Sequence, residues 1–330
     1  MRLLITGGGG YIGTTLIPYL LRKGHKIRLI DKFFFGKNII NEHKNLEKID
    51  IDTREINQDH FKDIDIVIDM VSISNDPSGE KFQESTWEIN WGSRIKCCKL
   101  AKKNNIKKYI LVSSCSIYGS TNHDIVVNET SNANPQTTYA KANRKAEIDN
   151  LKLADNDFEV IVLRLATAFG LSKRMRFDLA INAMTLNAIN SDNIPLMRDG
   201  TQWRPFVHVK DISRAIHHFC EINTKKLDSK IFNVGSKKNV CKLADLGQIV
   251  KKSIQQKNNK DKIKIKWYGD PDIRSYNVCF NKIEETGFKS KFSIKFGVDE
   301  ILNAILTKNL TKTPDTITLD WYNQINAFNR

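Results

Sequence analysis

The chain contains 330 residues, of which 40% are hydrophobic and 27% charged, a composition typical of a globular protein large enough to bury a sizeable core. The formal net charge of +15 comes mostly from lysines spread along the chain. The densest basic run, residues 251–266, favours a solvated loop and strand over a patch that binds polyanions. We therefore expect no nucleic-acid partner.

The cysteines and the apolar runs exclude further classes. The six cysteines form no CxxC pair, and no histidine lies at a metal-ligand spacing from them, so we expect neither a metal site nor a disulfide framework. Scattered thiols indicate a reducing compartment. We find no signal-peptide pattern and no run that approaches about 18 apolar residues, so we expect a cytoplasmic protein without a membrane partner.

Strands and helices alternate through the first half of the chain. Short apolar strands are predicted at residues 2–6, 25–31, 65–71, 108–114 and 158–166. Helices are predicted between them, notably at residues 14–24, 86–104 and 139–154. Repeated strand–helix–strand units give a parallel sheet with helices on both faces. The predicted fold class is therefore α/β, with a doubly wound parallel sheet of the Rossmann type.

The pattern becomes less regular in the second half. Short strands are predicted from "IPLM" at 194–197, "RPFVHV" at 204–209 and "IFNVG" at 231–235, with scattered helices between them. We expect a dinucleotide-binding domain over residues 1–170, to which some later segments return. Residues 171–330 would form mainly a smaller substrate-binding part and a C-terminal tail.

A glycine-rich loop joins the first predicted strand to the first helix. Gly7, Gly10 and Gly13 have the spacing G-x-x-G-x-x-G. The first glycine permits a tight turn, the second lets a pyrophosphate approach the backbone, and the third permits close helix packing. The helix N-terminus adds N–H groups that attract phosphates. An ordinary flexible turn is the alternative, but the position of the loop favours a bound dinucleotide.

The second predicted strand ends in an acid, Asp31. An acid at this position accepts hydrogen bonds from the adenosine ribose and repels a 2′-phosphate. The expected cofactor is therefore NAD. Lys32 follows directly and leaves NADP as the alternative.

Several motifs together resemble one family. "TGGGGYIG", "DIVIDMV", "SSCSIYG", "TTYAKANRKAE", "LRLATAFG" and "RPFVHVKDISRA" occur in the order and spacing of extended short-chain dehydrogenases/reductases, over roughly residues 1–300. That family includes nucleotide-sugar epimerases, dehydratases and 4-ketoreductases. The segment "LRLATAFGLSKRMRFDLAINAM" further resembles nucleotide-heptose dehydrogenases and epimerases. The resemblance implies NAD bound across the sheet and a nucleoside-diphosphate sugar held by the C-terminal part.

The resemblance assigns catalytic roles to two hydroxyl groups. Tyr139 matches the tyrosine that transfers a proton, and Ser114 matches the Ser/Thr that hydrogen-bonds the reacting hydroxyl. Removal of a hydride from a sugar carbon requires a base for the hydroxyl proton, and the same group returns the proton when the ketone is reduced. The alternatives are a surface tyrosine on a helix and a hydroxyl at the end of a strand.

The resemblance also implies contacts with both ligands. The implied cofactor contacts are Gly7, Gly10, Tyr11, Ile12, Gly13, Asp31, Lys32, Asp52, Thr53, Met70, Val71, Ser113, Tyr139 and Asn143. The implied substrate contacts are Thr167, Arg176, Asn182, Arg204 and Arg274, with Arg174 as an additional candidate. A guanidinium suits bidentate recognition of a pyrophosphate, and a surface salt bridge is the alternative for each arginine. The histidines His208, His217 and His218 are expected to pack or to face solvent.

The sequence departs from the family pattern in two places. Sugar 4,6-dehydratases of the family carry an Asp-Glu pair after the catalytic Ser/Thr, but Cys115 and Ser116 occupy these positions here, which disfavours dehydration. The lysine that follows the catalytic tyrosine by four residues is replaced by Asn143. An asparagine can hydrogen-bond a ribose hydroxyl but supplies no charge.

We predict an NAD-dependent enzyme that epimerises or oxidises a nucleoside-diphosphate sugar through a keto-sugar intermediate. A ketosugar reductase that consumes NADH is the second enzyme reading, and a catalytically silent NAD-binding protein is the alternative of another class. The predicted helices at 86–104 and 139–154 resemble the pair that family members pack into an intersubunit four-helix bundle. A homodimer is therefore expected; the alternative is that the apolar residues of these helices, including Trp91, Ile95 and Leu100, are buried within one subunit.

Overall fold

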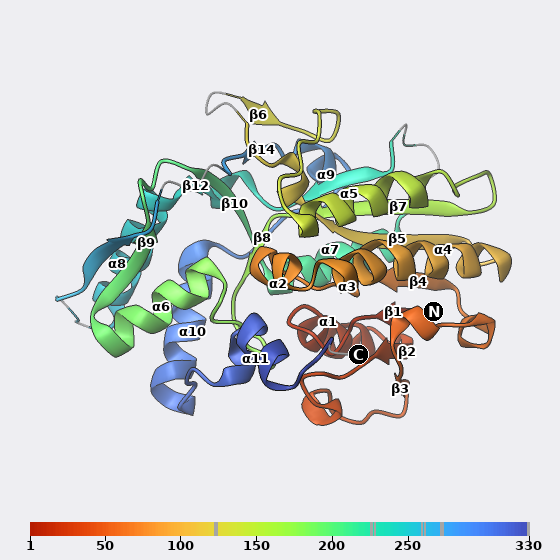
Figure 1. Ribbon diagram of the computed structural model, residues 1–330, viewed down its shortest axis with the longest axis horizontal. Helices are drawn as coiled ribbons and strands as arrows, with labels where there is room; N and C mark the ends of the chain where they lie inside the picture. The colour runs from red at the N-terminus through yellow and green to blue at the C-terminus, as the bar shows by residue number, and fades with distance from the viewer. Residues whose placement is uncertain are drawn as a thin grey trace.

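The computed structural model describes residues 1–121, 125–224, 227, 229–258, 260, 262–270 and 274–328. Its largest element is a sheet of seven strands in the order β11-β7-β5-β4-β1-β2-β3, all parallel (Figure 1). The strands are β1 (Arg2–Thr6), β2 (Lys26–Asp31), β3 (Leu46–Asp50), β4 (Ile66–Asp69), β5 (Lys108–Ser114), β7 (Glu159–Leu165) and β11 (Ile231–Val234).

Helices cover both faces of this sheet, because alternate side chains of its apolar strands point to opposite sides. Leu3 and Ile5 of β1 belong to a core formed with α1 (Gly13–Arg22) and α7 (Val209–Glu221). Leu4, between them, packs in the core on the other face, with α4 (Arg94–Lys103) and α5 (Thr138–Leu151). The doubly wound parallel sheet expected from the sequence is thus confirmed.

The helix predicted over 86–104 consists of three pieces. α3 (Gln83–Trp87) passes into a π-helical turn, Glu88–Ser93, and then into α4. Within the turn, Asn90 is fully buried and its amide pairs with the backbone N–H and carbonyl of Ile73, at 2.8 and 3.1 Å. A π-turn changes the register of the residues that follow it and often lies at a functional site. Here it delivers Arg94, the first residue of α4, into the protein interior.

Two strands of the sheet differ from the sequence prediction. β3 was not predicted, because its sequence LEKID is largely polar and none of its residues is fully buried. The segment "IFNVG" was expected in the C-terminal part, but as β11 it pairs with β7 at the edge of the large sheet. α7 also comes from the second half and packs on the sheet. The boundary at residue 170 stays a prediction for the two parts as folding units.

Among the remaining elements, those at residues 180–197, 243–258, 264–268 and 294–308 gather at the end of the molecule away from the large sheet, at the left of the view (Figure 1). Their third core contains Phe169, Leu196, Leu246 and Val298 among its buried residues. All the remaining strands are β6 (Val126–Val127), β8 (Thr167–Phe169), β9 (Asn193–Met197), β10 (Trp203–His208), β12 (Val240–Lys242), β13 (Lys264–Tyr268) and β14 (Asn277–Val278). The remaining helices are α2 (Asp76–Lys81), α6 (Ala180–Ser191), α8 (Leu243–Asn258), α9 (Asn281–Glu285), α10 (Ile294–Lys308) and α11 (Thr318–Gln324). None of the described helices is long and apolar enough to cross a membrane.

The C-terminal helix α11 returns to the large sheet and lies between α10 and the N-terminal strands (Figure 1). The indole Nε1 of Trp321 donates to the backbone carbonyl of Phe34, just beyond β2, at 2.6 Å. Phe34, Tyr322 and Phe328 stack edge to face, with ring centroids 5.1 to 5.8 Å apart. The tail is therefore fastened by an aromatic cluster at the carboxyl end of β2.

Candidate active site

A cavity of about 640 Å³ runs along the carboxyl ends of the parallel strands. Its lining includes Gly7 after β1, Asp31 at the end of β2, Met70 after β4, Ser114 at the end of β5 and Ala166 after β7. The strand order reverses between β1 and β4, and ligands of open α/β sheets bind at such a reversal. The position of the cavity therefore follows from the topology.

The three glycines of the loop differ in how much room the structure leaves for a side chain. Gly7 has φ +71°, and a β-carbon on it would lie 2.5 Å from the Cα of Val71. A β-carbon on Gly13 would lie 2.1 Å from the carbonyl oxygen of Gly8. At Gly10 the nearest described atom would be 3.5 Å away, an ordinary contact. The protein's own packing thus requires glycine at 7 and 13, whereas at 10 it leaves room for a β-carbon.

The carboxylate of Asp31 is positioned by backbone donors. It accepts hydrogen bonds from the N–H groups of Gly9 and Phe33, at 2.8 and 2.6 Å. Burial raises the pKa of Asp31 to about 6, against the lowering effect of these two donors. Lys32, Asp52 and Thr53 line the same end of the cavity. This end therefore brings together the acid and the glycine loop that the sequence predicts for an adenosine ribose and a pyrophosphate.

Tyr139 and Ser114 meet at the cavity wall. Tyr139 lies in the first turn of α5, whose N-terminus is capped by the hydroxyl of Thr137 accepting from the N–H of Ala140, at 3.2 Å. Tyr139 and Ser114 both line the cavity, and the Ser114 hydroxyl lies near enough to the Tyr139 phenol to act on its pKa. Burial raises the pKa of Tyr139, and the hydrogen bond with Ser114 partly opposes this effect. The predicted proton carrier and its hydroxyl partner are thus brought together.

Asn143 also lines the cavity, one helical turn after Tyr139. Its Nδ2 donates to the backbone carbonyl of Tyr139 at 2.9 Å, and its Oδ1 accepts from Nη1 of Arg94, also at 2.9 Å. Sequence reasoning missed Arg94, because a lone arginine on a helix is normally exposed. The one signal in the sequence was the uncharged Asn143 at the position of the family lysine, which indicates that another residue supplies the positive charge.

Arginines line the end of the cavity that lies toward the C-terminal part. Arg204 donates to the backbone carbonyl of Trp203 at 2.9 Å and lies over the ring of Tyr276, 5.1 Å from its centroid. Arg274 forms an ion pair with Asp76, a residue that the sequence reasoning did not single out. Thr167 contributes to the same lining. The guanidinium groups of Arg204 and Arg274 are suited to bind an anionic group of a substrate.

A second pair of arginines lies nearer the glycine loop. Arg176 forms a two-pronged salt bridge with Asp178, with both N–O distances 2.9 Å. The guanidinium of Arg174 lies 3.8 Å over the ring of Phe35. Its Nε and Nη1 are buried and have no hydrogen-bond partner among the described residues. Both arginines line the cavity.

Among the predicted contact residues, Gly13 and Asn182 are the two that do not line the cavity. Gly13 acts through packing. Asn182 is fully buried; its side chain accepts from the N–H of Gly170 at 3.0 Å and donates to the carbonyl of Arg176 at 2.9 Å and the hydroxyl of Tyr11 at 3.2 Å. Its amide thus holds the wall behind the cavity together.

The positions that carry the dehydratase acids in related enzymes carry no acid here. Cys115 is 1% exposed, and its thiol donates to the carbonyl of Arg164 at 3.3 Å, away from the cavity. Burial raises the pKa of Cys115, so the thiol stays neutral. Ser116 lines the cavity, but a hydroxyl does not ionise near neutral pH.

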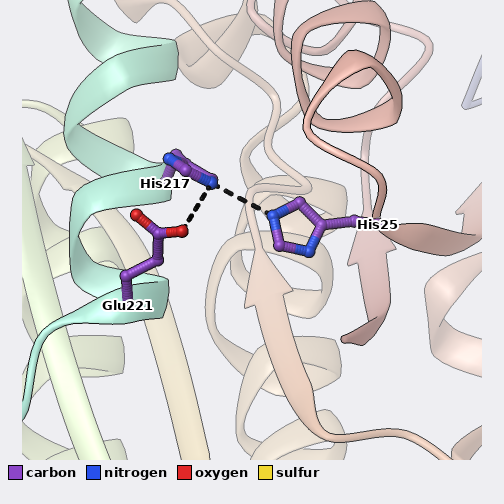
Figure 2. Close-up of side chains that lie close together, drawn as sticks. All are labelled: His25, His217 and Glu221. Carbon is purple, nitrogen blue, oxygen red and sulfur yellow. Dashed lines mark hydrogen bonds and ion pairs between the residues drawn. The ribbon is translucent and has the colours of Figure 1, made fainter.

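The histidines lie outside the cavity lining. His208 contacts Glu300 at 2.7 Å, and His218 contacts Thr286 at 2.9 Å. Figure 2 shows His25 and His217 pointing toward each other, with Nε2 atoms 3.1 Å apart, and Glu221 beside His217. Burial lowers the pKa of His25, and the charges of the N-terminus and Lys23 lower it further. The rings of His25 and His217 pack edge to face, with their centroids 5.1 Å apart.

Several known proteins are similar to this chain in sequence and in fold. A putative UDP-glucose 4-epimerase of Methanocaldococcus jannaschii is 24% identical over 315 residues, which cover 94% of this chain and all of that protein. The UDP-N-acetylglucosamine 4-epimerase of Methanobrevibacter ruminantium, solved with UDP-N-acetylmuramic acid, has a TM-score of 0.81 at 23% identity and covers 93% of this chain and 98% of its own. The UDP-glucuronic acid 4-epimerase of Bacillus cereus, solved with UDP-glucuronic acid and NAD, has a TM-score of 0.80 at 20% identity, over 93% and 100%.

UDP-sugar decarboxylases and a dTDP-glucose 4,6-dehydratase are also similar to the chain, so these likenesses do not choose one reaction. The family model described as "NAD dependent epimerase/dehydratase family" matches residues 3–235. This match confirms the expected resemblance and the NAD cofactor. The chain belongs to the NAD dependent epimerase/dehydratase family.

Proposed function

We propose that the protein is an NAD-dependent epimerase of a nucleoside-diphosphate sugar. One observation carries the proposal: Tyr139 and Ser114 line a single cavity whose lining also includes the glycine loop, Arg204 and Arg274. The relatives named as UDP-sugar epimerases support the same substrate class.

The residues divide the work in a simple way. The glycine loop and Asp31 would hold NAD, which would supply the acceptor for a hydride from a sugar carbon and the donor that returns it. Tyr139 as phenolate takes the proton of the hydroxyl on that carbon, and returns it when the ketone is reduced on its other face. Ser114 donates a hydrogen bond to the oxygen throughout. Arg204 and Arg274 hold the pyrophosphate while the sugar rotates to present its other face.

The C-terminal segment that lies at the adenosine end of the cavity favours epimerisation over ketone reduction. Tyr322 and Phe328 of the C-terminal segment line the cavity beside Phe34 and Phe35, next to the expected adenosine site. An epimerase regenerates NAD in every cycle and can retain it, whereas a reductase must exchange its cofactor each turn. A C-terminal segment that is fixed beside the adenosine site therefore favours an enzyme that retains its NAD. The buried Cys115 argues against 4,6-dehydration.

The direct test is turnover without added cofactor. We would incubate the purified protein with a panel of UDP- and dTDP-sugars and analyse the sugars by NMR. A new epimer formed without net NADH consumption supports the proposal. A product that appears only in proportion to added NADH would identify a reductase, and no product from any sugar together with retained NAD would favour the silent NAD-binding alternative.

The quaternary structure and the compartment stay predictions. α4 and α5 lie beside each other on one face of the sheet, as the proposed homodimer requires. Trp87, just before the π-turn, is 37% exposed, and its ring meets Trp91 edge to face at 6.2 Å. This exposed aromatic edge is the surface that we propose a second copy covers.

A further inference from the structure

A fully buried arginine stands behind the asparagine that replaces the family lysine. Arg94 has no exposed surface, and its Nη1 donates to Oδ1 of Asn143 at 2.9 Å. The nitrogen of the same side chain, Nδ2, donates to the backbone carbonyl of Tyr139 at 2.9 Å. Arg94 and Asn143 thus form a continuous hydrogen-bonded chain that ends at the backbone of Tyr139, in the first turn of α5.

The guanidinium is held in place from several sides. Its Nη2 donates to the carbonyls of Asp69 and Val112, at 3.1 and 2.6 Å, and its Nε lies 3.4 Å from the carboxylate of Asp69. That carboxylate also accepts from Thr6 at 2.6 Å and from the hydroxyl of Tyr109. A buried charge persists only when it is paired and hydrogen-bonded in this way. The cation is therefore fixed, and its direction is set by three strands of the sheet.

We propose that Arg94 acts through Asn143 as a positioning residue that places behind Tyr139 the fixed positive charge that a lysine at position 143 would place beside it. The inference rests on the proton-carrier role proposed for Tyr139. Asn143 keeps the second hydrogen of its amide for the nicotinamide ribose, so the two tasks of one lysine are divided between two side chains.

The groups around Tyr139 act in both directions. Burial and the charge of Asp76 raise its pKa, whereas the hydrogen bond of Ser114 and the charges of Arg94 and Arg176 lower it. Asp69 pairs with Arg94 and weakens the field that reaches the phenol. Removal of Asp69 alone should therefore strengthen the effect of Arg94, which gives the inference a sign that a merely structural role does not share.

The test is the pKa of Tyr139 in the NAD-saturated protein, followed by NMR of tyrosine labelled at Cζ and assigned with Tyr139→Phe. Asp69→Asn leaves the cation without its counter-charge, so we expect a lower pKa than in the unchanged protein. Asp69→Asn with Arg94→Met removes both charges together, which avoids a buried unpaired ion. We expect the pKa of Tyr139 to rise in this variant by roughly one unit, the low end for a neighbouring charge. Equal values in all three proteins, or the reverse order, would overturn the inference.

A stability cycle provides a second test if Asp69→Asn does not fold. Asn143→Lys alone sets an ammonium against the guanidinium of Arg94, so its thermal midpoint should fall. Adding Arg94→Met to Asn143→Lys should recover part of the loss. If Arg94→Met lowers the midpoint as much in the Asn143→Lys background as alone, Arg94 does not face position 143 as a charge and the inference fails. Neither measurement needs the substrate, so failure of the proposed epimerase activity would be seen separately.

Discussion

A β-carbon on Gly10 would lie 3.5 Å from the carbonyl oxygen of Gly7, whereas one on Gly13 would lie 2.1 Å from the carbonyl oxygen of Gly8. The two positions therefore separate cofactor binding from folding. We predict that Gly10→Ala folds like the unchanged protein but binds NAD about tenfold or more weakly, because the methyl group occupies the approach of the pyrophosphate. Calorimetric titration with NAD measures this. Gly13→Ala is the matched control and should lower the thermal midpoint, as overpacking typically destabilises by about 1–3 kcal/mol. Normal NAD affinity in Gly10→Ala would refute the assigned pyrophosphate position.

The carboxylate of Asp31 should make cofactor selectivity depend on pH. Its pKa of about 6 means that it is charged above this value and becomes neutral below it. The charged form repels a 2′-phosphate and accepts from ribose hydroxyls, so the preference for NAD over NADP should weaken as the pH falls from about 8 to about 5. Dissociation constants for both cofactors across this range measure the effect. Asp31→Asn should show a smaller preference with no such pH dependence; an unchanged preference would contradict the prediction.

The C-terminal cover should slow the release of NAD. Trp321→Ala removes the hydrogen bond to Phe34 and loosens the aromatic cluster beside the cavity. We predict faster dissociation of NAD, measured by stopped-flow displacement, with little change at Tyr139. Trp267→Ala provides the control, because Trp267 is a 41% exposed tryptophan on β13. Equal release rates in the two variants would mean that α11 does not retain the cofactor, and the preference for an epimerase over a reductase would lose its support.

The proposed dimer can be broken from its exposed edge. Light scattering at micromolar concentration should give twice the chain mass of 37.8 kDa. Trp87→Glu places a charge at the proposed contact and should shift the protein toward the monomer, whereas Trp267→Glu should not. A monomer in the unchanged protein would contradict the dimer directly.

The sequence could predict those site residues that lie at the end of a strand or at the start of a helix. The glycine loop follows a strand, Asp31 and Ser114 end strands, and Tyr139 lies in the first turn of a helix, so their positions relative to the cavity follow from the order of elements. Arg94 and Asp76 could not be found in this way. Asp76 meets Arg274 from a distant part of the chain, and Arg94 is turned inward by the π-turn before it. Such contacts depend on tertiary packing that no local pattern encodes.

The same reason explains the residues that lie elsewhere than expected. Asn182 is on a helix that borders the cavity, but its amide pairs with the backbone of Gly170 and Arg176. β3 has a polar sequence because an edge strand is half exposed, so its periodicity is weak. The aromatic cover formed by Tyr322 and Phe328 joins the two ends of the chain, and neither end alone carries a signal for it.

Proton transfer by Tyr139 has a simple test of magnitude. Tyr139→Phe keeps the ring in place but removes the group that takes the hydroxyl proton, so turnover should fall about 10²-fold or more while NAD affinity stays nearly unchanged. Ser114→Ala should reduce turnover less, since it removes one hydrogen bond. Because burial raises the pKa of Tyr139, activity should increase as the pH rises toward that pKa. Full activity of Tyr139→Phe would show that another group moves the proton.

The fate of carbon-bound deuterium tests the central claim most directly. A nucleotide sugar that the protein epimerises would be supplied with deuterium on its ring carbons, in ordinary water and without added cofactor, and the product analysed by NMR and mass spectrometry. Hydride transfer to bound NAD and back predicts that the new epimer keeps all its deuterium, and that Tyr139→Phe forms almost none of it. Replacement of deuterium at the inverted carbon by hydrogen from water would contradict the account, because it would mean that the carbon loses a proton rather than a hydride.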